Sequence, residues 1–212
     1  MDYTSQMVAL LGAVRKEMNG AALDSLRYYG ADYGLNYGAP ITALRAIARS
    51  RGCDDGLARF LYRQQVRELR IIALWTADPT KTTPADFGFW AEGVVNSEVA
   101  EQAAQALLSR IADIGALLAQ WCGEGGELLA YAALLAAARS TAVTVEQACE
   151  AARCAVVRFG DSHLVVQGSC ALLSAVATDT ASRNRVRSLL AELPDSPTTT
   201  ALRDEMSWRL EY

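Results

Sequence analysis

Four arginines recur at helical spacing between residues 59 and 70. They are Arg59, Arg63, Arg67 and Arg70. Steps of four, four and three residues would align them on one face of a continuous helix. Such a stripe is suited to phosphate oxygens, because each guanidinium presents paired hydrogen-bond donors. Gln64-Gln65 interrupts the pattern and Glu68 lies beside it. Solvated and ion-paired arginines spread over two helices are therefore the alternative.

A second pattern precedes these arginines, where glycines recur every four residues with tyrosines beside them. The segment is Tyr28-Tyr29-Gly30-Ala31-Asp32-Tyr33-Gly34-Leu35-Asn36-Tyr37-Gly38. It is not a dinucleotide fingerprint, which needs G-x-G-x-x-G after a strand. One interpretation is a long turn whose glycines take positive φ and whose tyrosines cover the end of the core. The other is a contact with phosphate groups, for which Tyr33, Tyr37 and the following Arg45 are the candidates.

The remaining reactive side chains form no recognisable constellation. His163 is the only histidine, and no nucleophile elbow or matching cysteine motif accompanies it. The cysteines are odd in number and scattered, and no C-x-x-C occurs, which favours buried thiols over disulfides or zinc. They are Cys53, Cys122, Cys149, Cys154 and Cys170. We expect no catalytic histidine, no metal and no cofactor. We also expect the four tryptophans, Trp75, Trp90, Trp121 and Trp208, to be core residues.

The charge of the chain is distributed unevenly. The net charge of −4 alone would argue against a nucleic-acid partner. Residues 41–75, however, hold seven arginines against three acidic residues, whereas residues 76–130 hold eight acidic residues against Lys81 and Arg110. A basic region is therefore followed by an acidic one, and the basic region is the candidate for binding anions.

Neither a membrane span nor a secretory signal is expected. The longest strongly apolar run, residues 128–138, has 11 residues, well short of the roughly 20 that cross a bilayer. An apolar segment, residues 7–14, precedes Arg15 and Lys16, which is the reverse of a secretory signal. We expect a cytoplasmic protein with no membrane partner.

The elements that carry these residues are expected to be helices throughout. Apolar residues recur at spacings of three and four, and no stretch alternates as a strand does. Helix breakers divide the 212 residues at 30–40, 78–84, 123–126, 159–161 and 194–197. Each block has room for two helices, which is typical of HEAT-like repeats of about 40–47 residues. Thr83, Asn96, Thr144 and Ser162 are expected helix caps. We therefore predict a single all-α domain over residues 1–212. We expect an α-solenoid of roughly six helical hairpins whose concave face binds a partner.

Three segments of the first half resemble one known family. They are Tyr37-Gly38-Ala39-Pro40-Ile41-Thr42-Ala43-Leu44-Arg45, then Leu57-Ala58-Arg59-Phe60-Leu61-Tyr62, then Val66-Arg67-Glu68-Leu69-Arg70-Ile71-Ile72-Ala73-Leu74. In order and spacing they are similar to the bacterial DNA alkylation repair family, the AlkD-type alkylpurine glycosylases. The resemblance continues through Thr83-Pro84 and Phe89-Trp90 to Asn96 and covers about half of the chain. It implies stacked HEAT-like hairpins, a basic concave surface that holds duplex DNA, and excision of N3- or N7-alkylated purines.

The same resemblance implies a degenerate catalytic motif. The family's Asn-Trp-Asp-x-x-Asp segment falls on Asn96 to Glu101, so Ser97 replaces a tryptophan and Glu101 replaces the catalytic aspartate. Leu172 stands where a second tryptophan is expected, and an expected arginine pair is replaced around Ala130-Tyr131. The alternative to a catalytic role is that Glu101 stabilises the helix that begins after Asn96. Negative side chains near the N-terminus of a helix interact favourably with the helix dipole.

Two functions follow as hypotheses. The first is a divergent member of the DNA alkylation repair family that binds duplex DNA through the Tyr33 to Arg70 region. Its excision of alkylated purines is expected to be weak or absent, because the extra methylene of Glu101 displaces the carboxylate by about 1 Å, an error that costs on the order of 10²-fold. The alternative is a non-catalytic helical-repeat scaffold that binds a protein or peptide on its concave face.

Overall fold

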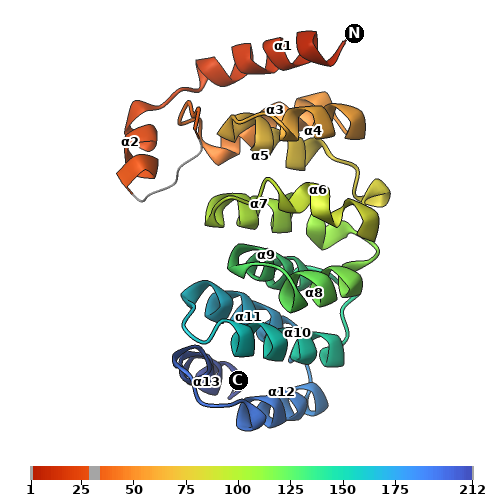
Figure 1. Cartoon of the computed structure of the whole chain (residues 1–212), viewed down its shortest axis with the longest axis vertical. Helices are drawn as coiled ribbons and strands as arrows, with labels where there is room; N and C mark the ends of the chain where they lie inside the picture. Colours follow the sequence, from red (N-terminus) through yellow and green to blue (C-terminus); the bar gives the residue numbers. More distant parts are fainter. Residues whose placement is uncertain (1, 29–33, 212) are drawn as a thin grey trace. The chain divides into compact units, whose positions relative to one another are not determined.

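The computed structural model describes residues 2–28 and 34–211 (Figure 1). These residues form thirteen α-helices and three short 3-10 helices, and they include no β-strand. The predicted all-α class is therefore confirmed. The chain divides into two compact units, residues 1–81 and 82–212, which we call unit 1 and unit 2. The single domain expected over residues 1–212 remains a prediction.

Unit 1 is built around helix α5. Its elements are α1 (Tyr3–Lys16), α2 (Gly20–Tyr28), α3 (Ile41–Arg51), α4 (Asp55–Tyr62), α5 (Arg67–Thr76) and the 3-10 helix η1 (Pro79–Lys81). Helix α5 packs against α3 and α4, and α1 packs against all three. Fully buried aliphatic side chains form the core, including Leu44, Leu57, Leu61, Leu69 and Ile72. Their removal from water is the main source of stability in this unit.

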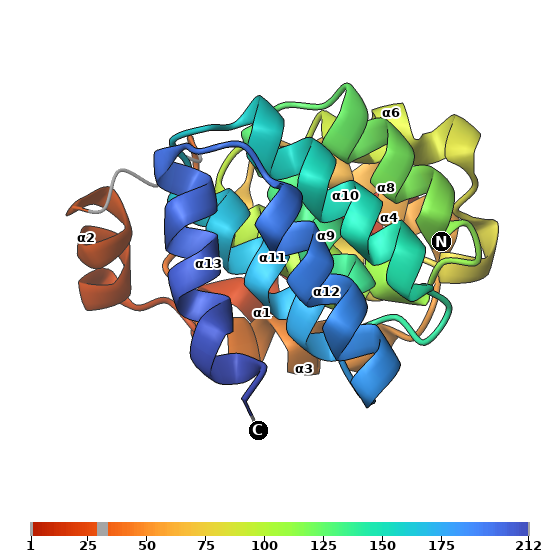
Figure 2. The ribbon, with the colours of Figure 1, turned by 90° about the horizontal axis from the view of Figure 1, so that it is seen from below.

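Unit 2 stacks its helices in two layers. Its elements are η2 (Pro84–Asp86), α6 (Phe87–Ala91), α7 (Ser97–Ala106), η3 (Leu108–Arg110), α8 (Ile114–Gly123), α9 (Glu127–Ala137), α10 (Val145–Arg158), α11 (His163–Val176), α12 (Thr180–Glu192) and α13 (Pro197–Arg209). One layer contains α7, α9, α11 and α13, each packed against the next. The other contains α8, α10 and α12. Consecutive helices α8 and α9, and α10 and α11, pair across the two layers (Figure 1, Figure 2). This is the arrangement expected for HEAT-like hairpins.

The helix starts predicted from local sequence are confirmed. The Asn96 side chain accepts from the backbone N–H of Val99 at 3.0 Å, and the Ser162 hydroxyl accepts from Val165 at 3.1 Å. Thr144 forms a reciprocal capping box with Gln147. Thr83 caps the short 3-10 helix that leads into α6. Each cap satisfies backbone donors that the first helical turn cannot pair internally.

Several helix boundaries lie outside the five breaker segments, and Gln64-Gln65 indicated the first of them. One is the break between α4 and α5, at residues 63–66. Another is the turn after α3, where Gly52 takes a φ of 77° and Asp54 caps α4 by accepting from Leu57 at 3.0 Å. Among the described residues, every helix is too short or too polar to cross a bilayer.

Candidate nucleic-acid interface

Arg67 is a buried structural residue. Its guanidinium Nη1 donates to the Ala39 carbonyl at 2.8 Å and to Glu68 Oε1 at 3.0 Å, and only 3% of the residue is exposed. Glu68 Oε1 also accepts from the backbone N–H groups of Tyr37 at 3.1 Å and Ala39 at 3.3 Å. The ion pair therefore holds the segment before α3 against the start of α5. Arg67 has no surface on which to meet a phosphate group, so it is left out of the interface.

The predicted stripe of four arginines is not formed, because residues 63–66 separate α4 from α5. Arg59 bonds Asp55 of its own helix at 2.8 Å. Arg63 is exposed at the C-terminal end of α4, and Arg70 Nε donates to the Gln64 carbonyl at 3.2 Å. The alternative interpretation, solvated and ion-paired arginines on two helices, agrees with Arg59. Arg67 is ion-paired but buried, which neither interpretation predicted. Arg63 and Arg70 remain candidates at the turn between α4 and α5.

The tyrosine–glycine segment behaves as a turn where it is described. Gly34 and Gly38 take positive φ values of 70° and 69°, as the turn interpretation expects. Any Cβ on Gly38 would lie 2.2 Å from the Asn19 carbonyl oxygen, so the glycine is required by close packing as well as by φ. Tyr37 is half-buried, with the Arg15 guanidinium 6.0 Å from its ring centroid. Tyr33 lies outside the described residues.

Arg45 belongs to a small surface cluster on α3 and α5 that the spacing of Arg59 to Arg70 did not reveal. Its guanidinium lies 4.7 Å from the ring centroid of Trp75, which is half-buried. Arg49 follows Arg45 by one helical turn and is exposed. We call Arg45, Arg49 and Trp75 the α3–α5 cluster. Stacking on an aromatic ring restrains a guanidinium and limits the entropy lost when it binds an anion.

The charges of the two units differ in sign. Unit 1 has eleven basic against eight acidic residues, a net charge of +3, and unit 2 has nine against sixteen, a net charge of −7. A polyanion is therefore attracted to unit 1 more than to unit 2.

Glu101 lies on α7 in unit 2 and contacts Tyr131 of α9. The Tyr131 hydroxyl donates to Glu101 Oε1 at 3.1 Å, and Glu101 itself is exposed. Burial, the negative charge of Glu101 and this hydrogen bond raise the pKa of Tyr131 to about 12. Tyr131 is therefore a neutral donor at physiological pH. The carboxylate that the family resemblance makes catalytic is bound by a buried tyrosine.

Gly168 of α11 allows Tyr131 and its neighbours to pack closely. A Cβ on Gly168 would lie 3.0 Å from Leu134 Cβ and 3.3 Å from Tyr131 Cδ2. A larger residue would push α9 and α11 apart. Because Tyr131 lies on α9, the position of its hydroxyl against Glu101 depends on this close approach.

The two positions where the resemblance lacks a tryptophan differ in location. Ser97 is the first residue of α7 and is half-buried, so a larger side chain there would reach the surface. Leu172 is fully buried in α11. A residue at 172 belongs to the core. Nearby on the same helix, Gln167 is exposed and Ala171 is half-buried. Of the two positions, 97 therefore lies near the surface and 172 lies in the core.

Two of the four tryptophans are core residues, Trp75 is half-buried, and one is exposed. Trp90 and Trp121 are buried as expected, whereas Trp208 on α13 is 52% exposed. His163 is exposed and is the first residue of α11. The described residues contain no group of three or more potential metal ligands.

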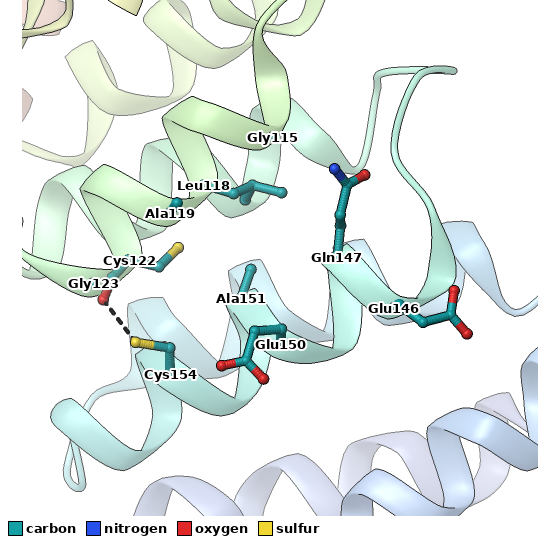
Figure 3. Close-up of a pocket in the computed structure, with 10 residues that line it drawn as sticks. All are labelled: Gly115, Leu118, Ala119, Cys122, Gly123, Glu146, Gln147, Glu150, Ala151 and Cys154. Carbon is teal, nitrogen blue, oxygen red and sulfur yellow. Dashed lines mark hydrogen bonds between the residues drawn. The ribbon is translucent and has the colours of Figure 1, made fainter.

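Unit 2 has a pocket of about 500 Å³ between α8 and α10 (Figure 3). Leu118, Ala119 and Ala151 give it an apolar floor. Glu146 and Glu150 add carboxylates, and Glu150 is paired with Arg153 at 2.5 Å. The Cys154 thiol donates to the Cys122 carbonyl at 3.5 Å. Burial raises the pKa of the Cys122 thiol to about 12, so this thiol is unreactive.

No protein-family model matches the chain, and no curated protein matches it. One solved structure is similar, described as "A new family of proteins related to the HEAT-like repeat DNA glycosylases with affinity for branched DNA structures". The similarity covers 100% of this chain and 97% of that chain, with a TM-score of 0.71 and 16% sequence identity. It shows that this chain has a HEAT-like repeat fold, in agreement with the prediction from the sequence.

Proposed function

We propose that this protein is a divergent relative of the HEAT-like repeat DNA glycosylases that binds DNA and excises alkylated purines weakly or not at all. The observation that carries the DNA-binding part is the α3–α5 cluster on a unit with a net positive charge, since phosphate contacts supply most non-specific affinity for DNA. Arg63, Arg70 and Tyr37 are further candidates in the same unit. The cytoplasmic location expected from the sequence belongs to the same proposal.

The contact between Tyr131 and Glu101 supports the catalytic part of the proposal. An efficient carboxylate must lie against the sugar of the nucleotide within a few tenths of an ångström. Glu101 is longer than the aspartate it replaces and is bonded to Tyr131 at 3.1 Å. Ser97 supplies no aromatic face beside it. The site retains a carboxylate and lacks the groups that would surround a lesion.

The form of the DNA is a second part of the proposal. The protein of similar fold is described as having affinity for branched DNA. We propose that this chain shares that preference, so a three-way junction should bind more tightly than a linear duplex of the same length.

The experiment is fluorescence anisotropy with both DNA forms at two salt concentrations, alongside an assay for release of 7-methylguanine. The proposal expects binding that weakens as salt rises, tighter binding of the junction, and little or no base release. No binding of either DNA at low salt would contradict it. Efficient base release would contradict its catalytic part.

A protein or peptide partner is the second candidate function, and the pocket between α8 and α10 favours it. The pocket combines an apolar floor with Glu146 and Glu150, in a unit of net charge −7. A basic peptide with one large apolar side chain would complement that chemistry. Binding of such a peptide, lost in Ala151→Trp, together with no DNA binding at physiological ionic strength, would favour this function over the first.

A further inference from the structure

A pocket of about 460 Å³ lies between α11 and α13 in unit 2. It is distinct from Glu101 and from the α3–α5 cluster. Its lining includes His163, Gln167, Ala171, Ala201, Glu205 and Arg209. Apolar atoms of both helices form part of its surface. An imidazole, an amide and a guanidinium supply hydrogen-bonding groups.

Trp208 does not line this pocket but lies at its edge on α13, next to Arg209, which does line it. It follows Ala201 by seven residues and Glu205 by three, which are the spacings of side chains on one helical face. The Arg209 guanidinium lies 4.7 Å from the ring centroid of Trp208, and Arg209 also lines the pocket. Arg209 thus connects the indole to the pocket.

The exposure of Trp208 is unusual for so large an apolar side chain. The indole is 52% exposed, whereas Trp90 and Trp121 are at most 1% exposed. A flat aromatic ring at the surface, beside a guanidinium, is the arrangement on which unpaired bases stack in proteins that bind single strands. Base stacking does not depend on base identity, because every base has a π face.

The charges in the pocket favour a base over a phosphate group. Glu205 Oε2 lies 3.4 Å from Arg209 Nη2 and offsets its positive charge. A phosphate inside the pocket would meet the Glu205 carboxylate at close range. A neutral base would not, and it could bond through its edge to Gln167 or His163. Volumes of a few hundred Å³ are typical of small-molecule sites.

We propose that this pocket receives one unstacked nucleobase from branched DNA, with Trp208 stacking on that base. The proposal rests on the DNA binding proposed above. We expect the pocket to take a base at a branch point of the DNA. A base next to a branch has lost a stacking partner, so removing it from the DNA helix costs less free energy.

The experiment uses a three-way junction with one unpaired 2-aminopurine at the branch point, whose fluorescence falls when the base stacks. The wild-type protein should quench this fluorescence. Trp208→Ala should abolish the quenching and weaken junction binding by about 5- to 150-fold, the loss expected for one base–aromatic stack, without changing duplex binding. Trp208→Phe should retain part of both effects, because it keeps an aromatic ring.

Val157→Ala is the matched control. Val157 is also 52% exposed, lies on α10 of the same unit, and should leave quenching and affinity unchanged. Thermal unfolding of each variant checks that the fold is intact. Equal junction affinity and quenching in the wild type and Trp208→Ala would overturn the proposal while DNA binding stands. Absence of any DNA binding by the wild type would overturn the proposed function and this inference together.

Discussion

The hydroxyl of Tyr131 on α9 donates to the carboxylate of Glu101 on α7 at 3.1 Å. The two residues are thirty positions apart in the sequence and meet because α7 and α9 are neighbours in one layer of unit 2. The carboxylate that the family resemblance makes catalytic therefore has a protein partner.

Glu101→Gln should abolish whatever release of 7-methylguanine the wild-type protein shows, because the amide cannot stabilise positive charge developing on the sugar. Junction and duplex affinities should change by less than twofold in Tyr131→Phe, because Tyr131 is only 4% exposed. Base release followed by mass spectrometry and anisotropy measure the two effects. Undiminished release in Glu101→Gln would remove the assigned role of this carboxylate.

Glu68→Gln should lower the free energy of unfolding by about 3–5 kcal/mol, as expected when one partner of a buried ion pair is removed. Arg67 would retain a buried positive charge, and the N–H groups of Tyr37 and Ala39 would lose a charged acceptor. Chemical denaturation gives the value. Glu150→Gln, which breaks the exposed pair with Arg153, is the control and should leave stability nearly unchanged. An unchanged free energy of unfolding in Glu68→Gln would mean that the ion pair holding the segment before α3 contributes little to stability.

The stability of the protein should fall in alkaline solution partly through Tyr131. Its pKa is raised from about 10 to about 12 in the folded protein, so the unfolded chain loses this proton first. The contribution of Tyr131 is therefore complete below pH 10 and is lost as the pH rises toward 12. Denaturation at pH 8, 10 and 11 should show a shallower decline in Tyr131→Phe than in the wild type. The Cys122 thiol, whose pKa is raised by burial, adds the same decline to both proteins.

Gly168→Ala should destabilise the protein by about 1–3 kcal/mol, the usual cost of overpacking a core. The new methyl group would meet Leu134 at 3.0 Å, and the flank of the Tyr131 ring lies at 3.3 Å. Displacement of α9 should also disturb the hydrogen bond to Glu101. Tyrosine absorbance during an alkaline titration measures this disturbance, because Tyr131 would ionise at a lower pH without the hydrogen bond to Glu101. Gly123→Ala, where a Cβ meets nothing within 4 Å, is the control.

Features set by neighbouring residues were predicted from the sequence. The caps at Asn96, Thr144 and Ser162 involve residues three positions apart, and the structure shows each of them. Helical periodicity likewise predicted the all-α class and the paired helices. Short-range hydrogen bonds and apolar spacing are properties of the sequence itself.

Features set by distant residues were not predicted. Arg67 was expected on a phosphate-binding stripe, and it is buried because its guanidinium bonds the Ala39 carbonyl, 28 positions earlier. Trp208 was expected in the core and lies at the surface. An arginine or a tryptophan side chain can be either buried or exposed. Which of the two occurs depends on how the other helices pack around it.

The central claim is that arginines of unit 1 bind DNA phosphates, and the salt dependence of junction binding tests it most directly. For wild-type protein, log Kd should change linearly with log salt. In Arg45→Gln/Arg49→Gln the slope should fall by about 1.8, since each lost phosphate contact removes about 0.9. Arg49→Gln alone, which leaves the stacking of Arg45 on Trp75 in place, should lower it by about 0.9. The control Arg153→Gln/Arg185→Gln removes two exposed arginines from α10 and α12 and should leave the slope as it is in the wild type. An equal slope in all four proteins would contradict the claim.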